Sequence, residues 1–284
     1  NSSILFKILG ATLAGQNELN KAVENYNRAI QINPNYAQAH NNLGVALHKL
    51  RKIDEAANSY KKSLSLKSDF AESFNNLGNA MVDLNKPKEA VQYFEKAIKI
   101  KSNYAEAYNN LGTVSEILAN KEKALSYYKE AIKIKKDYFD AYNNLGLLYC
   151  DLGRFDESKS NYNRAIKINP NYEKAYNNLG NLLSNIGKYD EATIKYKQAI
   201  KIKPNYAKAY SNLLFNLNYK TDFDPNLYLS VARQFSLNCR SIKKKFDIQY
   251  KYEKEPKKLR LGLVSADFGN HPGGFFTLST LREL

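Results

Sequence analysis

The chain has 284 residues, of which 43% are hydrophobic and 25% charged, a composition typical of a folded soluble protein rather than a disordered one. No apolar run approaches the ~18–20 residues that span a bilayer, and Cys150 and Cys239 match neither a disulfide framework nor a metal site. The net charge of +15 leaves nucleic acid open as a partner. We expect a cytoplasmic protein with no metal and no cofactor.

A 34-residue period organises the first two-thirds of the chain. Leu-Gly pairs recur at this step from Leu43-Gly44 to Leu179-Gly180, and an aromatic column recurs from Tyr36 to Tyr206. In each unit, apolar residues spaced i, i+3, i+4, i+7 predict an amphipathic helix, which a second helix follows. Because such a unit cannot bury its apolar stripe alone, neighbouring units must stack into a right-handed superhelix. The pattern resembles a tetratricopeptide-repeat array of six repeats with a terminal helix at about 206–219.

Lysines recur at one position of the repeat, inside "AIKI", namely Lys99, Lys133, Lys167 and Lys201. This position lies in the last turn of a predicted helix, where a cation stabilises the helix dipole. A second basic cluster from Arg240 to Arg260 holds nine Lys or Arg against three Asp or Glu and is typical of a solvated linker. We therefore favour a structural role for the positive charge over nucleic-acid binding.

Asparagines recur at one position of the first helix in each unit: Asn42, Asn76, Asn110, Asn144, Asn178 and Asn212. This position lies about 150° from the apolar stripe, so it is outside the core of its own hairpin. An amide offers donors and an acceptor and can bind the backbone of an extended peptide of any sequence. The column predicts a groove for protein substrates. The alternatives are a polar surface residue copied with the repeat and a link between repeats. The neighbouring column from Asn41 to Asn177 is expected to contribute less.

After the repeats, Asp224 and Pro225 predict the start of a helix that ends near Arg240 and docks on the array. From Lys258 the pattern changes, because "KLRLGLVSADFG" predicts a short strand and a glycine-containing turn before a further helix. Such a unit is typical of the start of an open α/β domain, which binds ligands at the carboxyl ends of its strands. Asp267 and His271 in the turn could orient a hydroxyl or move a proton, although their spacing alone favours a structural turn.

Three features together resemble the O-linked N-acetylglucosamine transferases and their SPINDLY-type relatives: the asparagine-bearing repeats, "SNLLFNLNY" at 211–219 and "LRLGLVSADFGNHP" at 259–272. The resemblance implies tetratricopeptide repeats over 1–219, a capping helix and basic linker over 220–257, and the start of a truncated, doubly wound glycosyltransferase domain over 258–284. It implies that Asp267 and His271 belong to an active site and that the column asparagines hold the substrate backbone. Tyr219 stands where the transferases have an active-site histidine. The donor therefore stays open between UDP-N-acetylglucosamine and GDP-fucose.

The resemblance implies transfer of N-acetylglucosamine or fucose to Ser or Thr hydroxyls of proteins by a longer enzyme. Because 284 residues do not reach a complete donor site, we expect this chain to be an inactive fragment of that glycosyltransferase. The alternative is a stand-alone repeat scaffold for protein–protein interaction. Partners are protein or peptide segments in either case, with neither nucleic acid nor membrane expected. Association of two copies through the repeats stays open.

Overall fold

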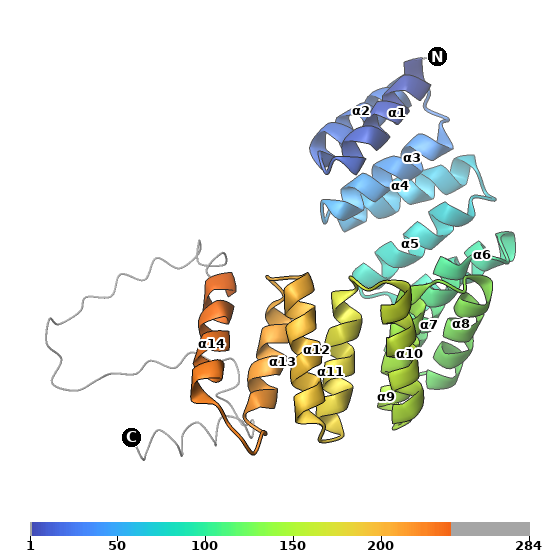
Figure 1. Cartoon of the computed structure of the whole chain (residues 1–284). Coiled ribbons are helices and arrows are strands. Elements are labelled where there is room, and N and C mark those ends of the chain that lie inside the picture. The colour runs from blue at the N-terminus through green and yellow to red at the C-terminus, as the bar shows by residue number, and fades with distance from the viewer. Residues whose placement is uncertain (1, 240–284) are drawn as a thin grey trace, which may run out of the picture. The chain divides into compact units, whose positions relative to one another are not determined.

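The computed structural model describes residues 2–239, which form helices and no strand (Figure 1). The helices are α1 Ser2–Gly15, α2 Leu19–Ile32, α3 Ala37–Lys49, α4 Ile53–Leu66, α5 Ala71–Asp83, α6 Pro87–Ile100, α7 Ala105–Ile117, α8 Lys121–Ile134, α9 Phe139–Asp151, α10 Phe155–Ile168, α11 Glu173–Asn185, α12 Tyr189–Ile202, α13 Ala207–Leu217 and α14 Pro225–Cys239. The strand and turn predicted from Lys258, with Asp267 and His271, lie outside the described residues.

The helices from α1 to α12 form six antiparallel pairs, and each pair packs on the next (Figure 1). Contacts also join odd-numbered helices of neighbouring pairs, as between α3 and α5 or between α11 and α13. Over residues 2–239, no comparable contact joins one even-numbered helix to the next. The odd-numbered helices therefore converge on the inner side of the array. The prediction of an all-helical superhelix is confirmed for this part of the chain.

A glycine in each of the first six odd-numbered helices allows the two helices of a pair to approach closely. A Cβ built on Gly112 would lie 2.4 Å from Cε1 of Tyr128 on α8, and one on Gly180 would lie 2.6 Å from Cε1 of Tyr196 on α12. Both distances are far inside van der Waals contact, so only glycine fits while the ring stays in place. The close approach predicted for Gly180 is confirmed.

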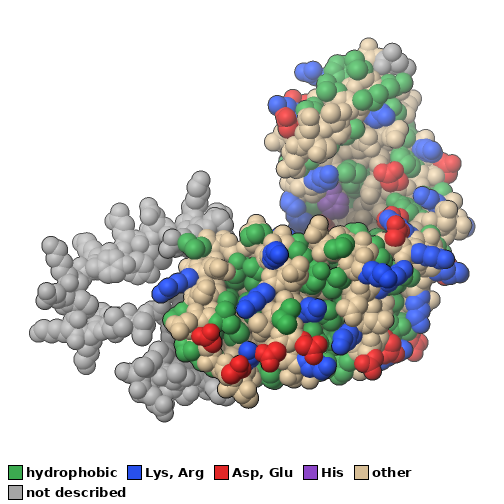
Figure 2. Space-filling model, viewed as in Figure 1, with side chains coloured by type: hydrophobic (Ala, Val, Ile, Leu, Met, Phe, Trp, Pro, Cys, Tyr) green, Lys and Arg blue, Asp and Glu red, His purple; other side chains and the backbone are tan. Residues whose placement is uncertain are grey.

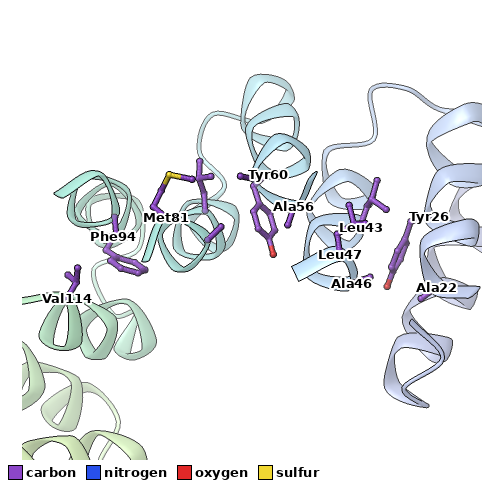
Figure 3. Close-up of a cluster of buried hydrophobic side chains, with 14 of the residues drawn as sticks. Ala22, Tyr26, Leu43, Ala46, Leu47, Ala56, Tyr60, Met81, Phe94 and Val114 are labelled. Atoms are coloured by element: carbon purple, nitrogen blue, oxygen red, sulfur yellow. The ribbon is translucent and has the colours of Figure 1, made fainter. Parts of the chain in front are cut away.

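The aromatic rings of the even-numbered helices fill the core between pairs. In Figure 3, Tyr26 of α2 lies beside Leu43 and Leu47 of α3, and Tyr60 and Phe94 fill the corresponding places farther along the array. All five side chains are buried. Burying a ring removes about 150–250 Å² from water, so these layers supply much of the free energy that holds neighbouring pairs together.

The turn within each pair ends the odd-numbered helix with one residue in the left-handed region. These residues are Asn17, Arg51, Asn85, Ala119, Gly153 and Gly187, with φ between 57° and 78°. The turn after α7 shows the hydrogen bonds that require this geometry, because the N–H of Ala119 donates to the carbonyl of Glu116 and that of Asn120 to the carbonyl of Ser115, both at 2.8 Å. Such bonds satisfy carbonyl groups left open at a helix end.

Helix α14 closes the far end of the described array. The Oδ1 of Asp224 accepts hydrogen bonds from the N–H groups of Asn226 (2.9 Å) and Leu227 (3.2 Å), which caps the helix start. Val231 is buried, and Leu227 and Phe235 pack in the same cluster, against α13. The sequence predicted both the cap and the docking of this helix on the array.

The charges of the even-numbered helices follow the helix dipole. In α10, Asp156 and Glu157 occupy the first turn and Lys167 the last; α12 repeats the pattern. Figure 2 shows the result over α9 to α13, where Asp and Glu side chains gather near one end of the helices and most Lys and Arg side chains lie nearer the other. The lysine column thus lies where cations stabilise helix ends, as the sequence predicts.

Candidate functional site

The candidate site is the inner face of the odd-numbered helices, which we define as the side turned away from the partner helix. In α7 the reference point is Gly112, which faces Tyr128 of α8. At about 100° per residue, Asn110 lies about 160° around the helix from Gly112. The same geometry applies to α3, α5, α9 and α11, because glycine and asparagine keep their spacing. The asparagine column therefore lies on the inner face, and each of its side chains is half-buried.

The column asparagines form a ladder of amide hydrogen bonds between neighbouring helix pairs. In each bond, the Nδ2 of a column asparagine donates to the Oδ1 of an asparagine 35 residues earlier. The five bonds are Asn76 to Asn41 (3.1 Å), Asn110 to Asn75 (3.0 Å), Asn144 to Asn109 (3.1 Å), Asn178 to Asn143 (2.9 Å) and Asn212 to Asn177 (2.9 Å). The structure therefore shows that this column links neighbouring repeats, which was one of the alternatives left open by the sequence.

The acceptors of the ladder belong to the neighbouring column, which the sequence analysis expected to contribute less. Asn41, Asn75, Asn109, Asn143 and Asn177 are all buried. A buried amide is costly unless it is hydrogen-bonded, and the ladder supplies that bond. Two asparagine columns offset by 35 residues were the signal in the sequence that could have revealed these pairs. Asn42 makes no such bond within residues 2–239, because Lys7 occupies the acceptor position in α1.

The ladder leaves part of each column amide available for a ligand. The Nδ2 of Asn110 or Asn144 has two N–H groups, and one of them is used in the ladder. The Oδ1 of Asn110 accepts no hydrogen bond from a described residue, and that of Asn144 accepts only a long one of 3.4 Å from Asn143. One donor and one acceptor therefore remain on each amide. This is the pair of groups needed to hold the N–H and C=O of an extended peptide.

Glu116, near the end of α7, lies four residues after Gly112, on the side of the helix that faces α8. The hydroxyl of Tyr128 donates to the carboxylate of Glu116. Burial raises the pKa of Glu116, and the negative charge of Asp151 raises it further, while the bond from Tyr128 and the charge of Lys121 act in the opposite direction. The charge of Asp151 thus lies close enough to oppose the ionisation of Glu116.

Tyr219 follows the end of α13 and is 52% exposed. Its ring stacks on Tyr189, with 5.8 Å between centroids, and packs at 5.0 Å against Phe215. These tyrosines line an open cavity of about 430 Å³ beside Lys220, whose Nζ pairs with Asp190 at 2.7 Å. The structure does not describe Asp267 and His271, so their proximity to Tyr219 stays a prediction.

The remaining reactive side chains show no catalytic arrangement within residues 2–239. The Cys150 thiol is half-buried, and burial raises its pKa. His40 and His48 bind the carbonyl of Pro34 (3.0 Å) and the carboxylate of Asp83 (2.7 Å) respectively. No group of three metal-ligating side chains occurs in this part of the chain. The same residues include no helix that is both long and apolar enough to cross a bilayer.

Family models of the tetratricopeptide repeat match most of the helical array. The model described as TPR repeat matches residues 10–50, 78–115 and 120–149, and two models described as tetratricopeptide repeat match residues 137–205 and 37–70. Together they cover well over half of the chain. No curated protein matches.

Solved structures show the same fold. The chain resembles the Cut9-Hcn1 structure of an APC/C hetero-tetramer with a TM-score of 0.69 and 16% identity, over 76% of this chain and 43% of that one. It resembles pilF of Pseudomonas aeruginosa with a TM-score of 0.64 and 18% identity, over 74% and 96% of the two chains. For MamA the TM-score is 0.50 with 30% identity, over 58% and 97%. The chain spans less than half of the Cut9-Hcn1 chain, and at 16% and 18% identity the first two likenesses show the fold alone. From the helix pairs and the family matches, the chain belongs to the tetratricopeptide-repeat family.

Proposed function

We propose that this chain binds extended segments of other proteins along the inner face of its odd-numbered helices. The observation that carries the proposal is the asparagine ladder, because the amides of Asn110 and Asn144 each keep a donor and acceptor capacity after the ladder bond is made. At Asn212 both N–H groups are used, by Asn177 and Asn181. A peptide backbone offers the complementary N–H and C=O at every residue. Recognition through the backbone would make the binding broad in sequence.

The ladder also supports the proposal by holding the amides in place. Each column asparagine from Asn76 to Asn212 is fixed by a bond of 2.9–3.1 Å to a buried neighbour. A side chain that is already ordered loses less conformational entropy when a ligand binds. An array of ordered amides at one-repeat intervals suits a ligand that runs along the superhelix.

The test separates the effect of losing the column amides from the effect of losing the ladder bonds. Asn110→Ala combined with Asn144→Ala removes two groups that would touch the peptide and also breaks two ladder bonds. Asn75→Ala combined with Asn109→Ala breaks the same two bonds from the acceptor side and leaves both column amides present. Fluorescence anisotropy would measure the affinity of each variant for a panel of short unstructured peptides of unrelated sequence.

We expect the first variant to lose about tenfold or more in affinity for every peptide that binds, since two hydrogen bonds to the peptide are lost. The second variant should bind more nearly like the original chain. Equal losses in the two variants would show that the ladder acts only between repeats. If no peptide binds the original chain, the proposed function itself is wrong.

The narrower prediction of a protein O-glycosyltransferase stays a proposal about a longer protein. It rests on the resemblance of residues 259–272, together with Asp267, His271 and Tyr219. In that protein the array would present Ser or Thr of a bound segment to a donor, either UDP-N-acetylglucosamine or GDP-fucose. Sequencing the reading frame beyond Leu284 and assaying the extended protein with both donors would test it. A stop codon directly after Leu284, or no transfer by the extended protein, would contradict it.

A further inference from the structure

Acidic side chains are segregated on the odd-numbered helices at the middle of the array. Helices α5, α7 and α9 contain six carboxylates and no Lys or Arg, in a chain whose net charge is +15. The six are Glu72, Asp83, Glu106, Glu116, Asp140 and Asp151. The flanking helices α1, α3 and α13 instead carry Lys7, Lys49 and Lys208 and no carboxylate, and α11 carries Lys174 beside Glu173. The charge of the odd-numbered helices is therefore positive in α1 and α3, negative in α5, α7 and α9, balanced in α11 and positive again in α13.

The spacing places five of these carboxylates on the inner face. Glu72, Glu106 and Asp140 each precede a column asparagine by four residues, one helical turn away on the same side. Asp83 and Asp151 each follow one by seven residues, which is close to two full turns. Glu116 lies four residues after Gly112 and accepts a hydrogen bond from Tyr128 of α8, so it faces the partner helix. We call the inner face of α5, α7 and α9, with the other five carboxylates, the acidic zone.

Three of the five carboxylates of the acidic zone lack an ion pair. Glu72, Asp140 and Asp151 have no Lys, Arg or His nitrogen within 4.0 Å among residues 2–239. Glu106 pairs with Lys135 at 3.6 Å, and Asp83 pairs with His48 at 2.7 Å and with Arg51 at 3.6 Å. The zone thus keeps negative charge that the described part of the chain does not neutralise.

Apolar side chains lie open on the same face. Ile117, seven residues after Asn110, is 53% exposed, and Leu147, three residues after Asn144, is 38% exposed. A ligand that fits this inner face therefore needs apolar groups to cover Ile117 and Leu147. It also needs positive charges to pair with the carboxylates that lack an ion pair.

The charges of Glu116 and Asp151 also favour a cationic ligand. Burial raises the pKa of Glu116, and the negative charge of Asp151 raises it further. A positive charge placed between them would remove this repulsion. An anionic ligand, including RNA or DNA, would instead increase it.

We propose that the acidic zone selects basic segments, so that the preferred partner is an extended peptide in which Lys or Arg alternates with apolar residues. This inference rests on the proposed function and narrows it. The column amides hold the backbone irrespective of sequence, and the carboxylates of α5, α7 and α9 bind the cationic side chains. Lys49 on one side and Lys174 on the other limit the zone to about three repeats.

The experiment neutralises the zone without changing its shape. The triple variant Glu72→Gln, Glu106→Gln, Asp151→Asn keeps side-chain volume and removes three negative charges. The matched control, Glu24→Gln, Glu95→Gln, Glu122→Gln, makes the same charge change at exposed positions of even-numbered helices. Fluorescence anisotropy would compare a peptide of alternating Lys and Leu with one of alternating Gln and Leu, at low and at near-physiological salt.

We expect the original chain to prefer the Lys peptide and the triple variant to lose about tenfold of that affinity at low salt, since each exposed pair contributes modestly. Binding of the Gln peptide should stay unchanged, and the control should keep the preference. Equal affinity of the original chain for the two peptides would overturn the inference and leave the proposed function intact. Equal loss in the triple variant and the control would also overturn it, because net charge would then be the cause. Failure of both peptides to bind would contradict the proposed function instead.

Discussion

The Nδ2 of Asn144 on α9 donates a hydrogen bond to the Oδ1 of Asn109 on α7 at 3.1 Å, and Asn109 is only 7% exposed. The bond therefore joins two neighbouring helix pairs through a group that water scarcely reaches. Its removal from one side leaves the other amide with an unsatisfied polar group.

We predict that Asn109→Ala lowers the free energy of unfolding by about 1–3 kcal/mol, because the substitution leaves the Asn144 donor unpaired. Asn144→Ala should cost about as much, since it strands the buried Oδ1 of Asn109. The double variant should lose less than the sum of the two, and urea unfolding of all four proteins would measure this coupling.

Asn42 supplies the control for that cycle, because it stands in the same column and makes no ladder bond within the described residues. Asn42→Ala should change the free energy of unfolding by less than about 0.5 kcal/mol, as is usual for a surface substitution. A loss as large as that of Asn144→Ala would show that the column stabilises the helices by another route.

The glycine facing Phe94 gives a second prediction. A Cβ on Gly78 would lie 2.5 Å from Cε1 of Phe94, so Gly78→Ala should force the ring or the helix to move and cost about 1–3 kcal/mol. Gly15→Ala is the matched control, since nothing lies within 4 Å of its Cβ position. That change should be neutral or slightly stabilising. Thermal unfolding followed by circular dichroism would compare both variants, and a higher midpoint for Gly78→Ala than for the original chain would contradict the packing argument.

Two equivalent turns provide a third prediction with opposite signs. Ala119 has φ 58° and Gly153 has φ 73° at corresponding positions of successive repeats. A left-handed residue with a Cβ costs roughly 1–2 kcal/mol, which glycine avoids. Ala119→Gly should therefore raise the midpoint of thermal unfolding, and Gly153→Ala should lower it. A shift in the same direction for both variants would be incompatible with this explanation.

The fold could be predicted from the sequence because each residue type that recurs in every repeat has a single physical role. Gly180 and Tyr196 recur together since the ring occupies the space of the missing Cβ. The ladder was harder to predict, because its partners are 35 residues apart and belong to different helix pairs. The angular position of Asn178 around its own helix places it outside the core of its own helix pair. That angle gives no information about which side chain of the neighbouring pair lies beside it. Only the stacking of two helix pairs shows that the buried asparagines of the neighbouring column accept hydrogen bonds from the half-buried column asparagines.

The raised pKa of Glu116 gives a prediction about pH. Burial and the charge of Asp151 make the folded chain hold the Glu116 proton more tightly than the unfolded chain does. The ionised group therefore opposes folding at all pH values above its folded pKa. This penalty disappears as the pH falls below the unfolded pKa of about 4.3, where both states are protonated. Glu116→Gln should raise the midpoint of thermal unfolding at pH 7, and the difference from the original chain should shrink toward pH 4.

Two features make this prediction specific to Glu116. The amide oxygen of glutamine can still accept the hydrogen bond from Tyr128, so the substitution removes the charge and keeps the contact. Because Asp151 contributes to the penalty, Glu116→Gln should stabilise less in an Asp151→Asn background than in the original chain. Glu95→Gln, on the exposed side of α6, tests whether any loss of negative charge has the same effect. A gain for Glu116→Gln that is equal at pH 4 and pH 7 would rule out relief of an ionised carboxylate as its cause.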